Sequence, residues 1–544
     1  MKRIAVAVLL LLMISGAVKA QTDYLPYSYQ FYQKLNPELY SIHTREHTAI
    51  KSNYADDSLM KQGVDSALNY GFSKNQNRLL NQHLIQSISG NNLFYADFMP
   101  DAYVGRDLSN NKTINSTTAG FQIGGSVSDK FSYNVGGFIG RGIFPSYLSA
   151  YINEVGMIPG QAVAHVSGSG YNWSYLTANV AFTPVKYLTI SAGRDKTFVG
   201  DGYRSLLLSD YAKPYPFFKL TANLGNVKYM ALWANFDDPE NPLINNYTSN
   251  RDKWGVFHYL DWNVNNRFSL GFFDSIIWAS KDDQGKPRGF DVSYINPLIF
   301  LRTVEASNGS PDNALIGGTA KYKLTDGVAI YGQFALDEFE GSNFFSSNGS
   351  SRNKYAWQLG VRGGNMFGVK NLSYLVESNN AKPYTYSERS PVQNFSGGSE
   401  PLAHPWGANF REAVGIINYS YKRFDFSIEA DFGRYGLDQN GMNYGKNIFQ
   451  NYQRPAGVVI PDGSNGNYES FGNYMGQGLT TNLTYFEGRA AYILNPKYNL
   501  RLEASGIYRE ERSSAFNYNA CIFTIGLRSS FRQIYNDLAS FQPH

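Results

Sequence analysis

Apolar and polar side chains alternate along short segments of the chain. One segment carries Phe424, Phe426, Ile428, Ala430 and Phe432, interleaved with Asp425, Ser427, Glu429 and Asp431. Because successive side chains of a strand point to opposite faces, this segment predicts a strand with one apolar face and one face that bears three carboxylates. A single strand of this kind also suits a soluble sandwich, so the repetition of the pattern decides the fold class.

The same alternation recurs over residues 316–324, 328–337, 355–362 and 499–505. Backbone groups in hydrocarbon must all be paired, and a sheet that closes on itself pairs them without leaving an edge. The pattern therefore predicts an all-β fold, namely a transmembrane antiparallel β-barrel.

Links of two lengths separate the predicted strands. Short links lie at residues 128–130, 183–186, 225–226, 263–267, 325–327, 421–423 and 495–497, and long polar segments at 143–170, 237–253, 339–354, 378–409 and 433–480. Short periplasmic turns and long external loops are the rule in such barrels. With this parity, residues 91–531 predict a barrel of about eighteen strands with both ends in the periplasm. Residues 288–302 read either as a strand pair or as a loop folded inward.

The end of the predicted barrel resembles a closing strand of outer-membrane proteins. Its outward face would carry Cys521, Phe523, Ile525, Leu527 and Phe531. Residues 532–544 follow, so the terminal aromatic residue is displaced from the end of the chain, and we expect these residues to form a periplasmic tail. Cys521 is the single cysteine of the chain and cannot form an internal disulfide.

The first twenty residues have the pattern of an export signal. Two basic residues precede an unbroken apolar run over residues 4–14, and small residues around Ala20 provide a cleavage point. A run of this length is too short to span a bilayer as a helix, so we expect residues 1–20 to be removed as a signal peptide. Residues 21–90 have few β-branched residues and mixed helical spacing, which predicts short helices and loops at the periplasmic mouth.

Composition agrees with a barrel and excludes nucleic-acid binding. Aromatic residues make up 15% of the chain and charged residues only 17%, whereas a soluble protein of this size usually carries more surface charge. Without Lys2, Arg3 and Lys19 the basic count falls from 48 to 45, against 44 acidic residues. A nearly neutral mature chain lacks the clustered positive charge that nucleic-acid binding needs.

One short motif suggests zinc chemistry. His43-Thr44-Arg45-Glu46-His47 matches the H-x-x-E-H pattern of some zinc peptidases. Catalytic zinc needs a third protein ligand in a cleft, and no second cluster of metal-binding residue types follows in the sequence. The context favours an ordinary polar segment, and we expect no metal and no cofactor.

Adjacent carboxylates occur at Asp237-Asp238, Asp282-Asp283 and Asp337-Glu338. Glycoside cleavage needs two carboxylates that face each other across a sugar, whereas neighbours on a strand point in opposite directions. His258 is the one histidine expected in a membrane-spanning strand, and no spacing singles out a partner for it. We therefore expect a non-enzymatic protein, with an outer-membrane hydrolase as a remote alternative.

The long loops are rich in Tyr, Asn, Gly and Ser, for example over residues 435–453 and 463–474. Aromatic rings offer apolar faces with a polar group, and amides make adaptable hydrogen bonds. This chemistry suits a sugar polymer, and the alternative that polar loops only coat the cell stays open at this point.

Three segments resemble the family of outer-membrane barrels that includes the capsule-assembly protein Wzi and the gliding-motility protein RemB of Bacteroidetes. They read GDGYRSLLLSD at 200–210 with PYPF at 214–217, INP at 295–297 with GSPDNAL at 309–315, and YGQF at 331–334 with LDEF at 336–339. Residues 33–36, 39–41 and 47–48 also look like the gliding branch.

The resemblance implies an eighteen-stranded barrel with an N-terminal helical part, located in the cell outer membrane and acting without catalysis in capsule attachment or gliding motility. Extracellular polysaccharide and surface motility or secretion proteins are the expected partners of a monomer. The polar motif residues that would support the loop fold or contact glycan are Arg204, Asp210, Glu305, Asp312, Asp337 and Glu338. Their other interpretation is a set of lumenal salt bridges that hold inserted loops.

A second hypothesis is a porin-type channel for small solutes, because a barrel of this size has room for an aqueous channel. In that case the segment over residues 288–313 is a candidate to fill the lumen.

Overall fold

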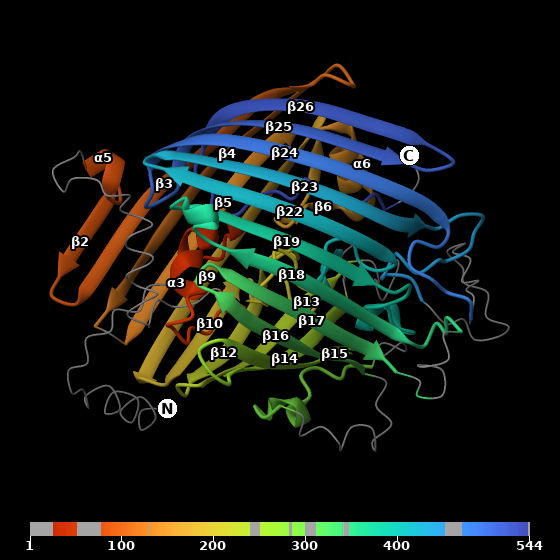
Figure 1. Ribbon diagram of the computed structural model, residues 1–544, viewed down its shortest axis with the longest axis horizontal. Coiled ribbons are helices and arrows are strands. Elements are labelled where there is room, and N and C mark those ends of the chain that lie inside the picture. The colour runs from red at the N-terminus through yellow and green to blue at the C-terminus, as the bar shows by residue number, and fades with distance from the viewer. Residues whose placement is uncertain are drawn as a thin grey trace.

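A closed sheet makes up most of the molecule. The structure, a computed structural model, describes residues 26–51, 78–128, 130–239, 251–281, 286–299, 312–339, 341, 348–451 and 471–541. Within these residues, eighteen antiparallel strands form a barrel (Figure 1). Strand β26 (Asn517–Arg528) closes the barrel by pairing with β3 (Asn92–Asp107). The predicted fold class and strand number are confirmed.

The other barrel strands follow in chain order: β4 (Lys112–Val127), β5 (Phe131–Ile143), β9 (Gly170–Val185), β10 (Leu188–Asp195), β12 (Tyr215–Asn223), β13 (Val227–Asp238), β14 (Arg251–Asn263), β15 (Phe268–Ala279), β16 (Asn313–Thr325), β17 (Val328–Glu338), β18 (Lys354–Gly363), β19 (Leu372–Ala381), β22 (Phe410–Tyr421), β23 (Phe424–Leu437), β24 (Leu479–Asn495) and β25 (Leu500–Arg512). Two short strands, β2 (Ile85–Ser89) and β8 (His165–Ser167), add to β3 and β9.

Three small sheets and several short helices complete the described chain. The sheets pair β1 (Ile50–Lys51) with β11 (Phe198–Val199), β6 (Met157–Ile158) with β7 (Ala162–Val163), and β20 (Ser396–Gly397) with β21 (Glu400–Pro401). The helices are α2 (Tyr29–Tyr32), η1 (Gln33–Leu35), α3 (Asn36–Leu39), α5 (Arg78–Asn81), α6 (Ser146–Val155), η2 (Val292–Ile295), η3 (Met366–Gly368) and η4 (Pro391–Gln393). None of these described helices has the length and apolar character needed to cross a membrane.

The two faces of the sheet differ as the alternation predicts. On β23 the side chain of Ile428 points outward and is 61% exposed, whereas Asp431 points into the barrel and is fully buried. Phe523 and Ile525 on β26 are likewise exposed. An apolar exterior and a polar interior are what a barrel needs in order to sit in lipid.

The two ends of the barrel also differ. The short-turn end carries tight links such as Asp326-Gly327 between β16 and β17, where Gly327 has φ +90°, a conformation that favours glycine. The long-loop end carries the long connections, which lie on the right in Figure 1, opposite the short turns. The predicted short links and their parity therefore match the structure.

Residues 286–299 lie on the outer wall of the barrel, not in its interior. Tyr294 packs against Trp233 and Trp278, and its carbonyl accepts a hydrogen bond of 2.8 Å from the Trp233 indole. These side chains belong to the opposite face of β13 and β15 from Leu232 and Ile277, which pack in the lumen. The interpretation of this segment as a loop that folds inward is therefore wrong for its described part, and residues 300–311 lie outside the described residues.

The first and the last described segments of the chain lie in the barrel. The N-terminal residues 26–51 lie within it, near the short turns, which is close to the predicted periplasmic mouth. Residues 529–541 follow β26, and the prediction of a periplasmic tail is wrong, because Asp537 and Leu538 are buried among lumenal side chains. The predicted boundary at residue 531 lies three residues beyond the end of β26 at Arg528.

Candidate functional site

Four segments fill the lumen, and we call them the plug segments: residues 26–51, 196–214, 382–409 and 529–541. Leu206, Leu208, Leu402 and Trp406 from two of them are almost completely buried in one apolar cluster with inward side chains of the strands. Helix α6 packs a second cluster at the long-loop end. The described residues therefore form a packed core in the interior of this barrel.

The segment over residues 382–409 corrects one prediction. The sequence places it among the external loops, but almost all of its residues are buried. Lys253 of β14 explains part of this placement, because its ammonium group donates hydrogen bonds to Asn394 and Ser396 of the segment. Sequence alone did not reveal the fold of this loop, since an inward loop satisfies its polar groups with lumenal side chains instead of water.

Asp201 joins the first two plug segments. Its carboxylate accepts hydrogen bonds from the hydroxyls of Tyr40, at 2.8 Å, and Thr48. Burial raises the pKa of Asp201, but the ammonium groups of Lys321 and Lys51 outweigh this effect and hold its pKa at about 2. The pairing of β1 with β11 lies beside this contact and fixes the same two segments together.

The motif at residues 200–210 enters the centre of the lumen. The backbone amides of Tyr203 and Arg204 donate to the carboxylate of Glu377 on β19, at 3.0 and 3.1 Å. A β-carbon at Gly202 would overlap that carboxylate, so the close approach requires glycine. This geometry gives a physical reason for the second of the two glycines that begin the motif.

Arg204 is the central cation of the lumen and is almost completely buried. Its guanidinium contacts Glu412 of β22 at 3.1 Å and Asp537 of the C-terminal plug segment at 2.5 Å. His404, from a third plug segment, contacts the other Glu412 oxygen at 2.8 Å. Burial lowers the pKa of Arg204, but the carboxylates of Asp537 and Glu412 outweigh it and raise the pKa well above its ordinary value.

The sequence-predicted residues occupy several places. Asp210 accepts a hydrogen bond of 2.9 Å from the Tyr535 hydroxyl. Asp337 and Glu338 both lie within 3.4 Å of the Lys354 ammonium group, and Asp337 also accepts from the backbone of residue 386 in a plug segment. Arg204, Asp210 and Asp337 thus contact inserted segments, Arg204 through ion pairs and the other two through hydrogen bonds.

Asp312 contacts both the outer wall and an inserted segment, because its carboxylate accepts a hydrogen bond of 3.5 Å from the side-chain amide of Gln393. It binds Arg288 at 2.5 Å and accepts from the Tyr294 hydroxyl, so it anchors the segment on the outer wall. Glu305 lies outside the described residues. Sequence analysis did not identify Glu377, Glu412 and Asp537 as residues of this site. The charged residues on the inward faces of the alternating strands were the available signal, because buried carboxylates need cations as partners.

The two histidines of the zinc-peptidase pattern face different partners. His43 contacts Asp326 at 3.2 Å, and His47 contacts Asp261 at 3.1 Å. Over the described part of the chain, no group of three or more His, Cys, Asp or Glu side chains is arranged to hold a metal ion. On the outer wall, His258 lies 3.8 Å from Asp274 and is stacked near Tyr229.

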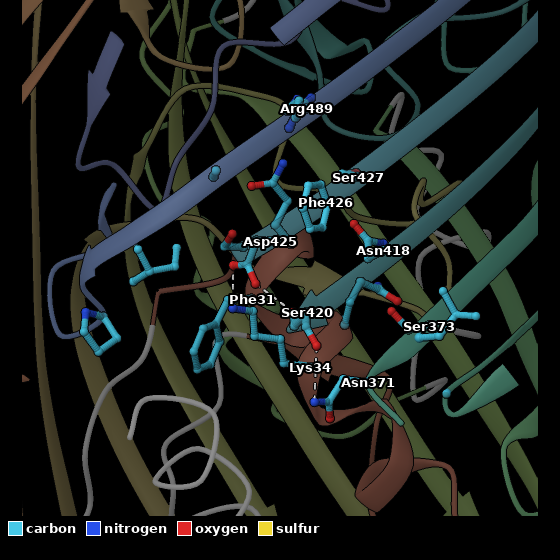
Figure 2. Close-up of a pocket in the computed structure, with 18 of the residues that line it drawn as sticks. Phe31, Lys34, Asn371, Ser373, Asn418, Ser420, Asp425, Phe426, Ser427 and Arg489 are labelled. Carbon is cyan, nitrogen blue, oxygen red and sulfur yellow. Dashed lines mark hydrogen bonds and ion pairs between the residues drawn. The ribbon is translucent and has the colours of Figure 1, made fainter. Parts of the chain in front are cut away.

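A cavity of about 520 Å³ remains at the short-turn end, between the N-terminal plug segment and strands β19 and β22 to β25 (Figure 2). Its wall carries hydroxyl and amide groups of Ser373, Asn418, Ser420 and Ser427. Lys34 enters it from the plug segment and binds Asp425 at 2.6 Å, as the dashed line in Figure 2 marks. The cavity has the size and the convergent polar groups of a ligand site.

The long-loop end presents a different surface. Phe471 and Tyr474 are 55% and 60% exposed, and Asn440 of the same connection is also exposed. The backbones of residues 472 and 473 bond to those of Asn348 and Gly349, so a second loop supports this surface. Of the loop examples in the sequence, residues 452–470 lie outside the described part.

The fold and the two-faced sheet define a transmembrane β-barrel of the outer membrane. Among solved structures, the outer-membrane protein Wzi of Escherichia coli, described as a carbohydrate-binding β-barrel involved in group 1 capsule assembly, matches with a TM-score of 0.55 at 13% identity, over 94% of this chain and 99% of that chain. OprD of Pseudomonas aeruginosa matches with a TM-score of 0.41 at 8% identity, over 80% of this chain and 94% of that one.

The likeness to Wzi is a likeness of fold, and at that level the resemblance seen in the sequence is confirmed. The resemblance to RemB stays a prediction. No protein-family model matches the sequence, and no curated protein matches it.

Proposed function

We propose that this protein is a non-enzymatic surface protein of the outer membrane that associates with extracellular or capsular polysaccharide and supports capsule attachment or gliding motility. The filled lumen is the observation that carries this proposal. Four plug segments, joined through Asp201 and Arg204, occupy the space that a channel protein leaves to water. A barrel of this kind serves as a rigid base for its external loops.

The chemistry of the long-loop end supports a sugar ligand. Tyr474 and Phe471 offer exposed rings beside polar backbone and amide groups. Rings of this kind stack on the apolar faces of sugars while neighbouring amides bond the hydroxyls. The carbohydrate binding that the description of Wzi states for that protein points in the same direction.

The proposal is tested by removing the two exposed rings. In the double variant Phe471→Ala/Tyr474→Ala, we expect intact cells to retain severalfold less capsular or added bacterial polysaccharide, because each lost ring removes a stacking surface. The measurement is polysaccharide retained per cell at equal amounts of barrel in the outer membrane. Tyr187→Ala is the matched control, because Tyr187 is 50% exposed in the turn between β9 and β10, at the other end of the barrel.

Equal retention and equal colony spreading by the double variant and the wild type would contradict a role for this surface. Scoring colony spreading with the same strains separates the two biological settings. Loss of retention alone indicates capsule attachment, and loss of spreading with normal retention indicates motility.

A further inference from the structure

We propose that the cavity at the short-turn end is a second binding site, which faces the periplasm and takes an acidic oligosaccharide. The choice of a sugar rather than another anion rests on the function proposed above. The position, charge and unused hydrogen-bonding groups of the cavity are independent of it.

The position of the cavity follows from the residues that line it. Asn371 and Lys422, which line the cavity, belong to the turns before β19 and between β22 and β23, so the mouth lies at the short-turn end. Phe31 of the N-terminal plug segment and Phe531 of the C-terminal one also form part of its wall. A ligand therefore enters from the periplasm, and the plug segments separate it from the long loops.

The charge of the cavity favours an anion. Its lining includes five cations, Lys34, Lys370, Lys422, Arg489 and Arg501, and three carboxylates, Glu38, Asp425 and Glu503. Arg489 and Arg501 point from β24 and β25 and are held by neighbouring carboxylates at 2.7 Å. Cations fixed in this way are oriented before a ligand arrives, which reduces the free-energy cost of binding.

Two residues that line the cavity each carry a buried amide nitrogen without a hydrogen-bond partner among the described residues. Within the described residues, Nδ2 of Asn418 and Nε2 of Gln33 have no hydrogen-bond partner, although both atoms are buried and both residues line the cavity. A buried donor that lacks a partner costs roughly 1–3 kcal/mol, so a ligand oxygen gains affinity when either side chain turns toward the cavity and donates to it. Gln33 is 2% exposed and belongs to the N-terminal plug segment.

The ligand class follows from these features together. Hydroxyl groups of Ser373, Ser420 and Ser427 offer donors and acceptors in several directions, as sugar hydroxyls require. The excess of cations suits a carboxylate on the sugar, and the volume of about 520 Å³ lies within the usual range for small-molecule sites. A uronic-acid oligomer has all of these properties.

The test uses the purified full chain in detergent and a short oligogalacturonate as the probe, with neutral maltohexaose as the uncharged comparison. The background is the double variant Phe471→Ala/Tyr474→Ala, which removes the external surface. We expect calorimetry to detect oligogalacturonate binding in this background and at least tenfold weaker binding of maltohexaose.

Filling the cavity gives the decisive comparison. In Ser427→Trp the added ring points into the cavity, and we expect at least a tenfold loss of oligogalacturonate affinity. Ile428→Trp is the control, because the neighbouring side chain points outward and is 61% exposed. If Ser427→Trp does not fold, Asn418→Leu, which replaces the unpartnered amide with methyl groups on a side chain of the same branching, is expected to lose several-fold affinity.

Binding of oligogalacturonate with unchanged affinity in the variant that folds would overturn the proposal, as would equal affinity for maltohexaose. The outcome is separate from that of the first proposal, because polysaccharide added to intact cells reaches the long loops and not the periplasm. If the cavity binds oligogalacturonate as expected but the double variant retains as much polysaccharide on cells as the wild type, only the external site is rejected.

Discussion

At the scale of single residues, the interior of this barrel depends on charges that are buried but paired. Arg204 serves three segments at once, since it bonds to Glu412 on the wall and Asp537 on the tail while its backbone amide donates to Glu377. Taking a charge out of water is costly unless a partner compensates it. The loss of one partner therefore has a larger effect than the loss of an exposed pair.

Arg204→Met tests this point. We expect the free energy of unfolding to fall by about 3–5 kcal/mol, because the variant leaves several carboxylates without their cation in the lumen. The measurement is guanidinium unfolding in detergent, followed by tryptophan fluorescence. Arg512→Met is the control, because the side chain of Arg512 is 66% exposed where it binds Glu510, and a change within about 0.5 kcal/mol is expected there. Similar losses in the two variants would argue against a special role for Arg204.

Glu400 gives the lumen a pH dependence. Burial raises the pKa of Glu400 to about 7, while its hydrogen bonds from the backbones of Gly160 and Lys213 and the charge of Lys196 act against this rise. The folded protein thus holds this proton more tightly than the unfolded chain, whose value is 4.5. The stability that the proton contributes is complete below about pH 4.5 and is lost as the pH rises to about 7.

In Glu400→Gln this contribution disappears, because the amide does not titrate. We expect the wild type to lose on the order of 1–3 kcal/mol of stability between pH 5 and 8 relative to the variant. Unfolding curves at several pH values measure the difference. Parallel pH profiles of the two proteins would show that Glu400 is already ionised at pH 5.

At the scale of elements, the C-terminal plug segment connects the two ends of the barrel. Ser529 bonds to Asp101 near the end of β26, and the amide of Ser540 bonds to Glu511 at the far end of β25. Phe541 then reaches Tyr151 of α6, near the C label in Figure 1. An extended segment of this length spans roughly 40 Å, which is enough to run the length of the lumen.

Replacing residues 535–541 with glycine and serine removes the contacts of this segment and keeps its length. Because the side chains of Tyr535 and Asp537 fill lumenal space, we expect the variant to show a steady open level in planar bilayers, whereas the wild type shows none. The same replacement in residues 513–516, the link between β25 and β26, is the control and is expected to stay closed. A steady open level in the wild type would favour the porin hypothesis, and a closed plug variant would show that the other segments seal the lumen.

At the scale of the whole molecule, the sequence predicted what local physics determines. Alternation on β23 and the Asp326-Gly327 turn depend on neighbours in the chain, so strand number and orientation followed from them. The contacts inside the lumen could not be predicted from the sequence, because Arg204 contacts Glu412 and Asp537, which are 208 and 333 residues away in the chain. Hydrophobic periodicity carries no information about such distant partners, and it equally could not tell that residues 286–299 lie outside the barrel.

The tail inside the lumen imposes an order on assembly. Pairing of β26 with β3 closes the barrel around the last described residues of the chain. These residues enter the lumen from the periplasmic side. A compact domain fused behind Phe541 is wider than the space that the other plug segments leave, so it cannot follow the chain through the barrel. Such a fusion is expected to arrest biogenesis before the barrel closes, whereas a short flexible epitope at the same place passes through and is displayed to antibodies on living cells.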